Sequence, residues 1–140
     1  MAPTAGDSEA SEEGSVGAEE NMAAAKRGYE AFVSGDAAGA MADIADDIEW
    51  ITPGNSAISG SVHGKQALGE HWGKLVERGF SVTPQYWFAD GDRVVVLVQN
   101  TLDGETSDAA DVLTFNADGK LTRFQTAGDT ARLERIFGSK

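Results

Sequence analysis

The chain has 140 residues, enough for one domain with its own core, and a formal charge of −12 from 23 acidic and 11 basic residues. It contains no cysteine, which excludes disulfides, thiolate metal sites and cysteine nucleophiles. No run of about 18 apolar residues and no basic segment followed by an apolar one occurs, so we expect a cytoplasmic protein without a membrane span or secretory signal. Because the basic residues are scattered, a nucleic-acid partner is not expected.

Residues 1–20 differ in composition from the rest of the chain. They contain six acidic residues and no Lys or Arg, so half of the net charge lies in this segment. A segment of that composition cannot bury enough apolar surface to offset the entropy lost on ordering. We therefore predict a disordered acidic tail over residues 1–20 and one folded domain over residues 21–140.

Two helices are predicted at the start of the domain. Asn21 is a suitable N-cap for a helix whose apolar stripe includes Tyr29 and which ends at Gly35. A shorter helix follows directly and includes Ile44 on its apolar side. Both helices are amphipathic, which predicts that each packs on a sheet or on another helix.

The middle of the chain predicts one strand and one further helix. The sequence IEWITPG alternates in polarity and then ends at a Pro-Gly break, which is typical of a strand. Residues 55–63 are predicted to form a loop that contains a short strand pairing near Val62. A third helix is predicted over residues 65–78, before the stop at Gly79.

From Phe80 onward the apolar period falls to two. The segments FSVTPQYWFAD, RVVVLVQNTLD, DAADVLTFN and KLTRFQTAG are separated by short Gly- and Asp-containing turns, which predicts an antiparallel meander. The run VVVLV at 94–98 is apolar on both faces, so we expect helices to cover one face and a second copy of the chain the other. The final DTARLERIF predicts a short helix or an extended arm.

One carboxylate interrupts the apolar face of the third strand of this meander. Because side chains alternate between the two faces, Asp111 shares its face with Ala109, Leu113 and Phe115. An apolar environment raises the pKa of a carboxyl group unless an Arg or several donors offset it, and such a group suits acid or base catalysis. The alternative is a carboxylate at the sheet edge that pairs with a neighbouring Arg.

The order of these elements resembles the SnoaL-like branch of the nuclear transport factor 2 and ketosteroid isomerase superfamily. The segments YEAFVSGDAAGAMADIADDIEW and DVLTFNADGKLTRF carry the resemblance, which spans about residues 21–130. It implies an α+β fold in which a cone-shaped, curved antiparallel sheet wraps around about three helices and encloses a pocket. The superfamily includes isomerases, cyclases, hydrolases, dehydratases and non-catalytic subunits, often dimeric, so the fold does not fix the function.

The resemblance assigns roles to three positions. The isomerase-type general base precedes the proline after the first strand, and that position is Thr52, which cannot accept a proton at neutral pH. The second isomerase carboxyl, a protonated acid that donates to an oxyanion, matches Asp111. The helix-1 tyrosine falls nearest to Gly28, so Tyr29 is a substitute displaced by one residue, about 100° around the helix.

Basic residues and histidines add further candidates. Epoxide hydrolases of this fold use an Asp-Arg-Asp arrangement, for which Arg93 or Arg123 would be the partner of Asp111. His63 lies between a loop and the third helix, near the expected mouth of the pocket, and suits proton transfer or stabilisation of negative charge. The alternative, which histidines at such positions adopt more often, is a solvated or capping residue. His71 is expected on the side of the third helix and away from the site.

Aromatic side chains and strand amides complete the predicted site. Large flat side chains can line a pocket for a planar ligand, although each alone is more often part of a core, and an inward amide orients a carbonyl. Asp46 and Asp47 lack the histidine or spaced acidic loop of a metal site, so neither a metal nor a cofactor is predicted. The predicted ligand-binding residues are Trp50, Trp72, Phe32, Phe88, Gln99, Phe115 and Gln125.

These features lead to three functional hypotheses. The first is a cofactor-independent acid/base enzyme, cyclase-, isomerase- or hydrolase-like, that acts on a small apolar carbonyl-containing or polycyclic molecule through Asp111, Tyr29 and His63. The second is a protein that binds such a molecule without chemistry, with Asp111 as a hydrogen-bond anchor. The third is a dimeric interaction module that uses the open face of the sheet.

Overall fold

The computed structural model describes residues 17–140. The predicted tail lies largely outside this range, but its last residues, from Ala18 onward, belong to the first helix. The elements are α1 (Ala18–Val33), α2 (Ala37–Met41), β1 (Ile44–Thr52), β2 (Gly60–His63), α3 (Lys65–Glu77), β3 (Ser81–Asp90), β4 (Arg93–Leu102), β5 (Glu105–Phe115), β6 (Leu121–Ala127) and α4 (Thr130–Phe137).

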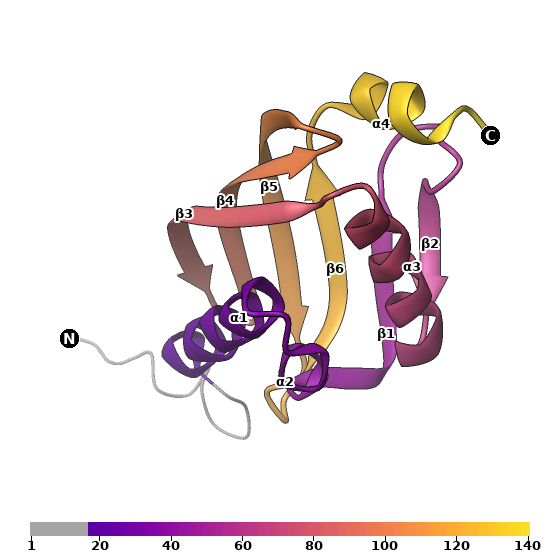
Figure 1. The fold of residues 1–140 in the computed structure, drawn as a ribbon. Helices are drawn as coiled ribbons and strands as arrows, with labels where there is room; N and C mark the ends of the chain where they lie inside the picture. Colours follow the sequence, from indigo (N-terminus) through magenta and orange to yellow (C-terminus); the bar gives the residue numbers. More distant parts are fainter. Residues whose placement is uncertain (1–16) are drawn as a thin grey trace.

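The six strands form one curved, open sheet in the order β2-β1-β6-β5-β4-β3 (Figure 1). Strands β3 to β6 form the predicted antiparallel meander. Strand β1, however, pairs with β6 in parallel, so the sheet is mixed and the prediction of a wholly antiparallel sheet is wrong on this point. No hairpin links β1 to β6, because one helix and four strands intervene, and the short turns that predict antiparallel pairing do not apply to this pair.

The helices cover one face of the sheet, which we call the inner face. Helix α1 contacts β3 and β4, whereas α3 contacts β1 and β2, so the two helices lie over opposite halves of the sheet (Figure 1). Val94, Val96 and Val98 point into the core between sheet and helices and are at most 2% exposed. Helix α4 lies across one end of the sheet (Figure 1). Within residues 17–140, no helix is both long and apolar enough to cross a membrane.

Two element boundaries differ from the sequence prediction. Helix α1 begins before Asn21, which is fully buried and donates from Nδ2 to the backbone oxygen of Gly91 at 3.3 Å instead of capping the helix. Ile44 belongs to β1 rather than to the second helix, where its side chain is buried in the core. In both cases a long-range contact takes the residue away from its local preference.

A bulge in β3 decides which of its aromatic residues face the inner side of the sheet. Pro84 pairs with Val98 and Tyr86 with Leu97, so one extra residue, Gln85, sits in β3 between two consecutive pairs. Beyond the bulge the alternation is reversed, and Trp87 points inward while Tyr86 and Phe88 point outward.

The outer face of the sheet carries an apolar patch, which we call the outer patch. It consists of Tyr86, Phe88, Val95, Leu97 and Val112, which are neighbours through the pairing of β3, β4 and β5. Tyr86 is 62%, Phe88 57% and Leu97 38% exposed. No element within residues 17–140 covers these side chains. An exposed apolar patch of this kind is typical of an interaction surface, so a dimer through the sheet remains a prediction.

We predict that two copies of the chain pair through the outer patch. Light scattering at micromolar concentration should show a dimer, and Leu97→Glu should convert it to a monomer because a charge would be buried at the centre of the interface. Val76→Glu is the matched control, since Val76 is an exposed apolar residue on α3. A monomeric native protein, or a dimer that survives Leu97→Glu, would contradict the prediction.

Candidate functional site

Asp111 lies on the inner face of β5, as the strand alternation predicts. Its side chain is 5% exposed and its strand neighbours on the same face, Leu113 and Phe115, are also buried. On the adjoining strands it is opposite Val96 of β4 and Thr126 of β6. The carboxyl group therefore lies in the middle of the sheet and not at its edge.

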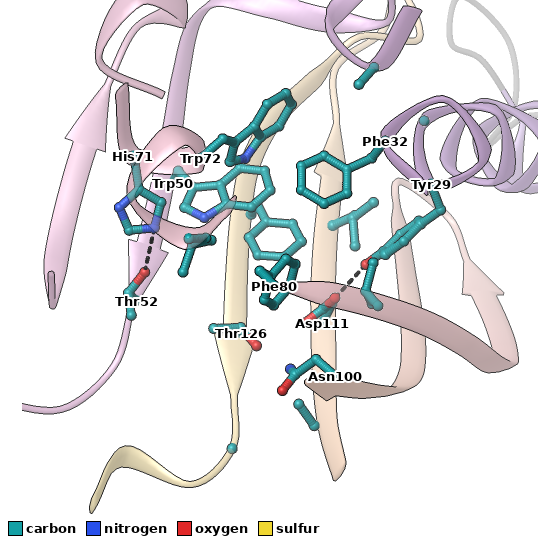
Figure 2. A pocket seen from close by; sticks show the side chains of 18 of the residues that line it. Tyr29, Phe32, Trp50, Thr52, His71, Trp72, Phe80, Asn100, Asp111 and Thr126 are labelled. Atoms are coloured by element: carbon teal, nitrogen blue, oxygen red, sulfur yellow. Dashed lines mark hydrogen bonds between the residues drawn. The ribbon is translucent and has the colours of Figure 1, made fainter. Parts of the chain in front are cut away.

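Tyr29 of α1 is the partner of this carboxyl group. Its hydroxyl donates to Asp111 Oδ2 at 2.5 Å (Figure 2), and its ring packs edge-on against Trp87 with a centroid distance of 5.5 Å. Burial raises the pKa of Asp111 to about 6, although hydrogen bonds from Tyr29 and Thr126 act to lower it. Burial and the adjacent carboxylate raise the pKa of Tyr29 well above its ordinary value, so Tyr29 remains a phenol that donates.

Aromatic side chains form the apolar wall of the pocket around this pair. Trp50 of β1 stacks on Phe124 of β6 with a centroid distance of 3.6 Å and an interplanar angle of 10°. Phe32 of α1 meets Trp72 of α3 edge-to-face at 5.2 Å and Phe80 at 5.8 Å (Figure 2). The cavity has a volume of about 160 Å³, similar to an engineered apolar cavity that holds benzene.

A second polar pair lies in the pocket wall. Thr52, at the end of β1, has its Oγ1 3.3 Å from Nε2 of His71 on α3, and both side chains are buried (Figure 2). Burial, and to a lesser extent the charge of Lys74, lowers the pKa of His71. His71 is therefore neutral at pH 7, and the pair supplies a hydroxyl and an imidazole that interact with each other.

The structure brings most of the predicted site residues together. Asp111, Tyr29, Trp50, Trp72, Phe32 and Phe115 all line the cavity, and so does Thr52 at the position matched to the isomerase base. These residues come from α1, β1, α3 and β5, which are separated in the sequence and meet on the inner face.

His63 lies outside the cavity, although the sequence predicted a position near the mouth of the pocket. It pairs with Glu49 in the register of β1 and β2, where the adjacent pair, Trp50 and Val62, faces inward. His63 therefore faces outward, where its side chain is 69% exposed and its Nε2 lies 3.7 Å from a Glu49 carboxylate oxygen. This location agrees with the solvated alternative for His63.

Three of the predicted ligand-binding residues point to the outer face. Phe88 does so because of the bulge in β3. Gln99 follows the inward-facing Val98 and is exposed. Gln125 is paired with Val112 of the outer patch, while its neighbours Phe124 and Thr126 line the cavity. The inward amide that the sequence suggested belongs instead to Asn100, which lines the cavity.

The arginines predicted as partners of Asp111 also lie on the other face. Arg123 is paired with Glu49 in the sheet register and its Nε lies 3.5 Å from the Glu49 carboxylate. Arg93 is exposed and opposite Thr114. The Asp-Arg-Asp arrangement of the epoxide hydrolases is thus not formed by these residues.

Several lining residues were not predicted. His71 lies on the stripe that Leu68, Trp72 and Leu75 define, so the helical period alone would have placed it inward. Arg132 of α4 is buried and lines the cavity together with Leu133. No local pattern indicates that a charged residue of a terminal helix turns inward.

Comparison with known proteins agrees with this geometry. A curved mixed sheet with helices over one face is the α+β architecture that this chain shares with NTF2-like structures. The family model of the SnoaL-like domain matches residues 25–124, and the chain belongs to this family. No functionally curated protein matches the chain.

Solved structures show the same cone. Bal32a, from a soil-derived mobile gene cassette, is 26% identical over 86% of this chain and 97% of its own, with a TM-score of 0.77. An NTF2-like protein of unknown function from Burkholderia pseudomallei is 25% identical over 86% and 98%, with a TM-score of 0.76. TerC, crystallised with polyporic acid, is 26% identical over 86% and 99%, with a TM-score of 0.75.

The raised pKa of Asp111 predicts a specific pH dependence of stability. The unfolded chain loses the Asp111 proton near pH 3.8 and the native protein near pH 6, so native stability falls as the pH rises through this interval. Between pH 4 and pH 8 the free energy of unfolding of Asp111→Asn should therefore increase by about 3 kcal/mol relative to that of the protein with Asp111. Urea denaturation across this range measures the difference.

The control for this measurement is Asp108→Asn, because Asp108 lies on the same strand but is exposed on the other face. The His71 contribution is common to the native protein and the variants, so it cancels in the difference. A difference between Asp111→Asn and the native protein that does not change with pH would contradict the raised pKa.

Proposed function

We propose that the protein is a cofactor-independent acid/base enzyme that moves a proton on a small planar carbonyl compound held in the cone. The observation that supports this most directly is the Asp111 carboxyl group, which is buried in an aromatic pocket, is bonded to the Tyr29 hydroxyl and has a pKa of about 6. A group with this pKa exchanges protons readily near neutral pH. A carboxylate that served only to stabilise the fold would be expected to have more hydrogen-bond donors around it.

The proton transfer uses both members of the pair. At pH 7 Asp111 is mainly ionised and takes the proton from the carbon next to the substrate carbonyl, while the C–H electron pair forms the enolate. Once Asp111 is protonated, the Tyr29 hydroxyl no longer faces a charged acceptor and turns its hydrogen bond to the enolate oxygen. Return of the Asp111 proton to another atom of the enolate completes an isomerisation or a ring closure.

The pocket wall supports a planar, largely apolar substrate. Trp50, Trp72 and Phe32 present flat surfaces, and the cavity of about 160 Å³ has room for one or two rings. TerC, which shares the fold and is 26% identical, was crystallised with the small molecule polyporic acid. A ligand in the cone of this chain is consistent with that precedent.

The second candidate, a protein that binds such a molecule without chemistry, has one observation in its favour. The position matched to the isomerase base is Thr52, whose hydroxyl is hydrogen-bonded to His71 and does not accept a proton at neutral pH. In this case Asp111 and Tyr29 only hold a ligand carbonyl or hydroxyl group.

Deuterium exchange into a ketone probe separates the two candidates. In D₂O the native protein should accelerate deuterium incorporation into 2-tetralone, measured by NMR, with a rate that rises as the pH passes through about 6 because Asp111 ionises. Asp111→Asn should reduce the catalysed rate by about 100-fold or more while the affinity for the ketone is nearly retained. Binding of 2-tetralone without exchange would favour the second candidate.

Tyr29→Phe tests the link between the two groups. The hydrogen bond from Tyr29 lowers the pKa of Asp111, so its loss should move the midpoint of the pH profile upward from about 6. Tyr86→Phe removes a hydroxyl from the outer patch and should leave the midpoint unchanged. A midpoint that does not move in Tyr29→Phe would argue against Asp111 as the titrating base.

A further inference from the structure

The end of the cavity under α4 contains a buried positive charge. Arg132 is 5% exposed and lines the cavity together with Asn100 and Asp129. An arginine side chain stays protonated in proteins, so this guanidinium is a fixed charge in the pocket wall. Burying such a charge is costly unless an anion or several acceptors compensate for it.

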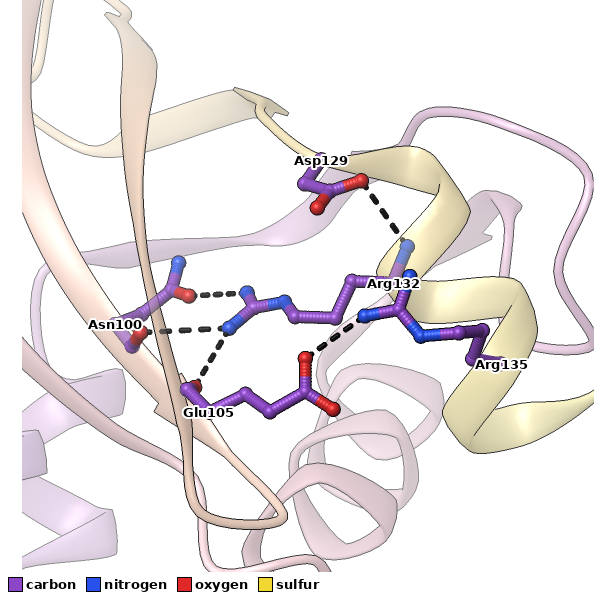
Figure 3. A network of polar contacts seen from close by, with 5 residues as sticks. All are labelled: Asn100, Glu105, Asp129, Arg132 and Arg135. Carbon is purple, nitrogen blue, oxygen red and sulfur yellow. Dashed lines mark hydrogen bonds and ion pairs between the residues drawn. The ribbon is translucent and has the colours of Figure 1, made fainter.

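Only neutral groups bind the guanidinium directly. Its Nη1 donates to the backbone oxygens of Glu105 at 2.9 Å and Asn100 at 3.4 Å, and its Nη2 donates to Asn100 Oδ1 (Figure 3). Nε is buried without an acceptor among residues 17–140. The structure thus holds the group in place, and although the charges of Asp129 and Glu105 favour it from a distance, no carboxylate of residues 17–140 contacts it directly.

The nearby carboxylates are engaged elsewhere. Glu105 Oε1 pairs with Arg135 at 2.8 Å, and Asp129 Oδ1 accepts the backbone N–H of Arg132 at 3.1 Å as the N-cap of α4 (Figure 3). Both carboxylates are exposed to solvent, unlike the guanidinium. No carboxylate oxygen in residues 17–140 lies within 4.0 Å of a guanidinium nitrogen of Arg132.

The buried cation and the proposed proton-transfer pair are associated with different residues of β4. Asn100, which contacts Arg132, is four residues along β4 from Val96, the residue opposite Asp111. Four residues of strand span about 13 Å. A ligand that reaches both ends therefore contacts Arg132 with one group and Asp111 with another.

We infer that Arg132 binds an anionic oxygen of the ligand, and that the natural ligand is a planar aromatic acid. This inference rests on the proposed function, because it assigns the substrate class of the same pocket. The aromatic wall accommodates the rings, and the Nε–H of the guanidinium, which has no acceptor among residues 17–140, offers a donor to a carboxylate. The acidic group is held at the α4 end, and the reacting carbon lies near Asp111.

A pair of matched probes tests this assignment. 2-Naphthoate and 2-naphthamide have the same rings and differ in charge, and calorimetry at pH 7.5 measures both affinities. We expect the native protein to prefer the acid by about tenfold or more, as for a charge-assisted hydrogen bond to a buried arginine. The proposed function is tested separately by exchange into neutral 2-tetralone, so one can fail without the other.

Asn100→Asp is the decisive variant. It is isosteric and gives Arg132 an internal carboxylate at the position of an existing hydrogen bond, so the fold should be retained and the preference for the acid lost. Arg132→Gln should also lose the preference, and if it unfolds, Asn100→Asp alone decides. Arg135→Gln, which removes an exposed arginine of the same helix, should leave the preference intact.

Three results would overturn the inference. They are equal affinity of the native protein for the two probes, an unchanged preference in a folded Asn100→Asp variant, and failure of both probes to bind. If Arg132 only joins α4 to the β4–β5 hairpin, the protein does not distinguish an acid from an amide through this residue. A purely structural role therefore predicts the first or the second result.

Discussion

The hydrogen bond from Tyr29 to Asp111 joins α1 to the middle of the sheet across 82 residues of sequence, and the arrangement of the pocket depends on it. A carboxyl group that is 5% exposed is tolerated only where a donor meets it. Helix α1 must therefore cross the sheet where Tyr29 reaches β5, and this position also brings Phe32 against Trp72 and Phe80. The same contact fixes the polar centre of the pocket and the aromatic wall beside it.

The alternation of the sequence predicts which side chains face inward where a strand is regular, and this prediction is wrong where the strand contains a bulge. Along β5 the alternation is unbroken from Glu105 to Thr114, and Asp111 faces inward as expected. In β3 the bulge at Gln85 reverses the alternation, which moves Phe88 to the outside. A bulge is set by pairing with the neighbouring strand, so the residues of one strand do not reveal it.

The inward orientation of other site residues can be predicted from the helix and strand periodicity of the sequence. His71 shares the stripe of Leu68 and Trp72, and Asn100 continues the inward series of Val94, Val96 and Val98. By the same alternation Gln99 belongs on the outer face. Arg132 is different, because only the packing of α4 across the end of the sheet brings its side chain into the cavity. Such contacts link distant segments and leave no local pattern.

In the proposed mechanism, proton transfer requires that the buried cation has little effect on the pKa of the buried acid. With an effective dielectric constant of about 20, unit charges attract by about 4 kcal/mol at 4 Å, and the attraction falls as their distance increases. An arginine in contact with Asp111 would stabilise the carboxylate and remove most of the effect of burial on its pKa. Arg132 is held by Asn100 and Glu105, and the pKa of Asp111 is set by burial and by the hydrogen bonds from Tyr29 and Thr126, so the pocket contains a fixed positive charge while the pKa of Asp111 is about 6. The cavity thus combines a charge suited to the proposed binding with an acid suited to the proposed chemistry, and each group has its own partner, Asn100 for Arg132 and Tyr29 for Asp111.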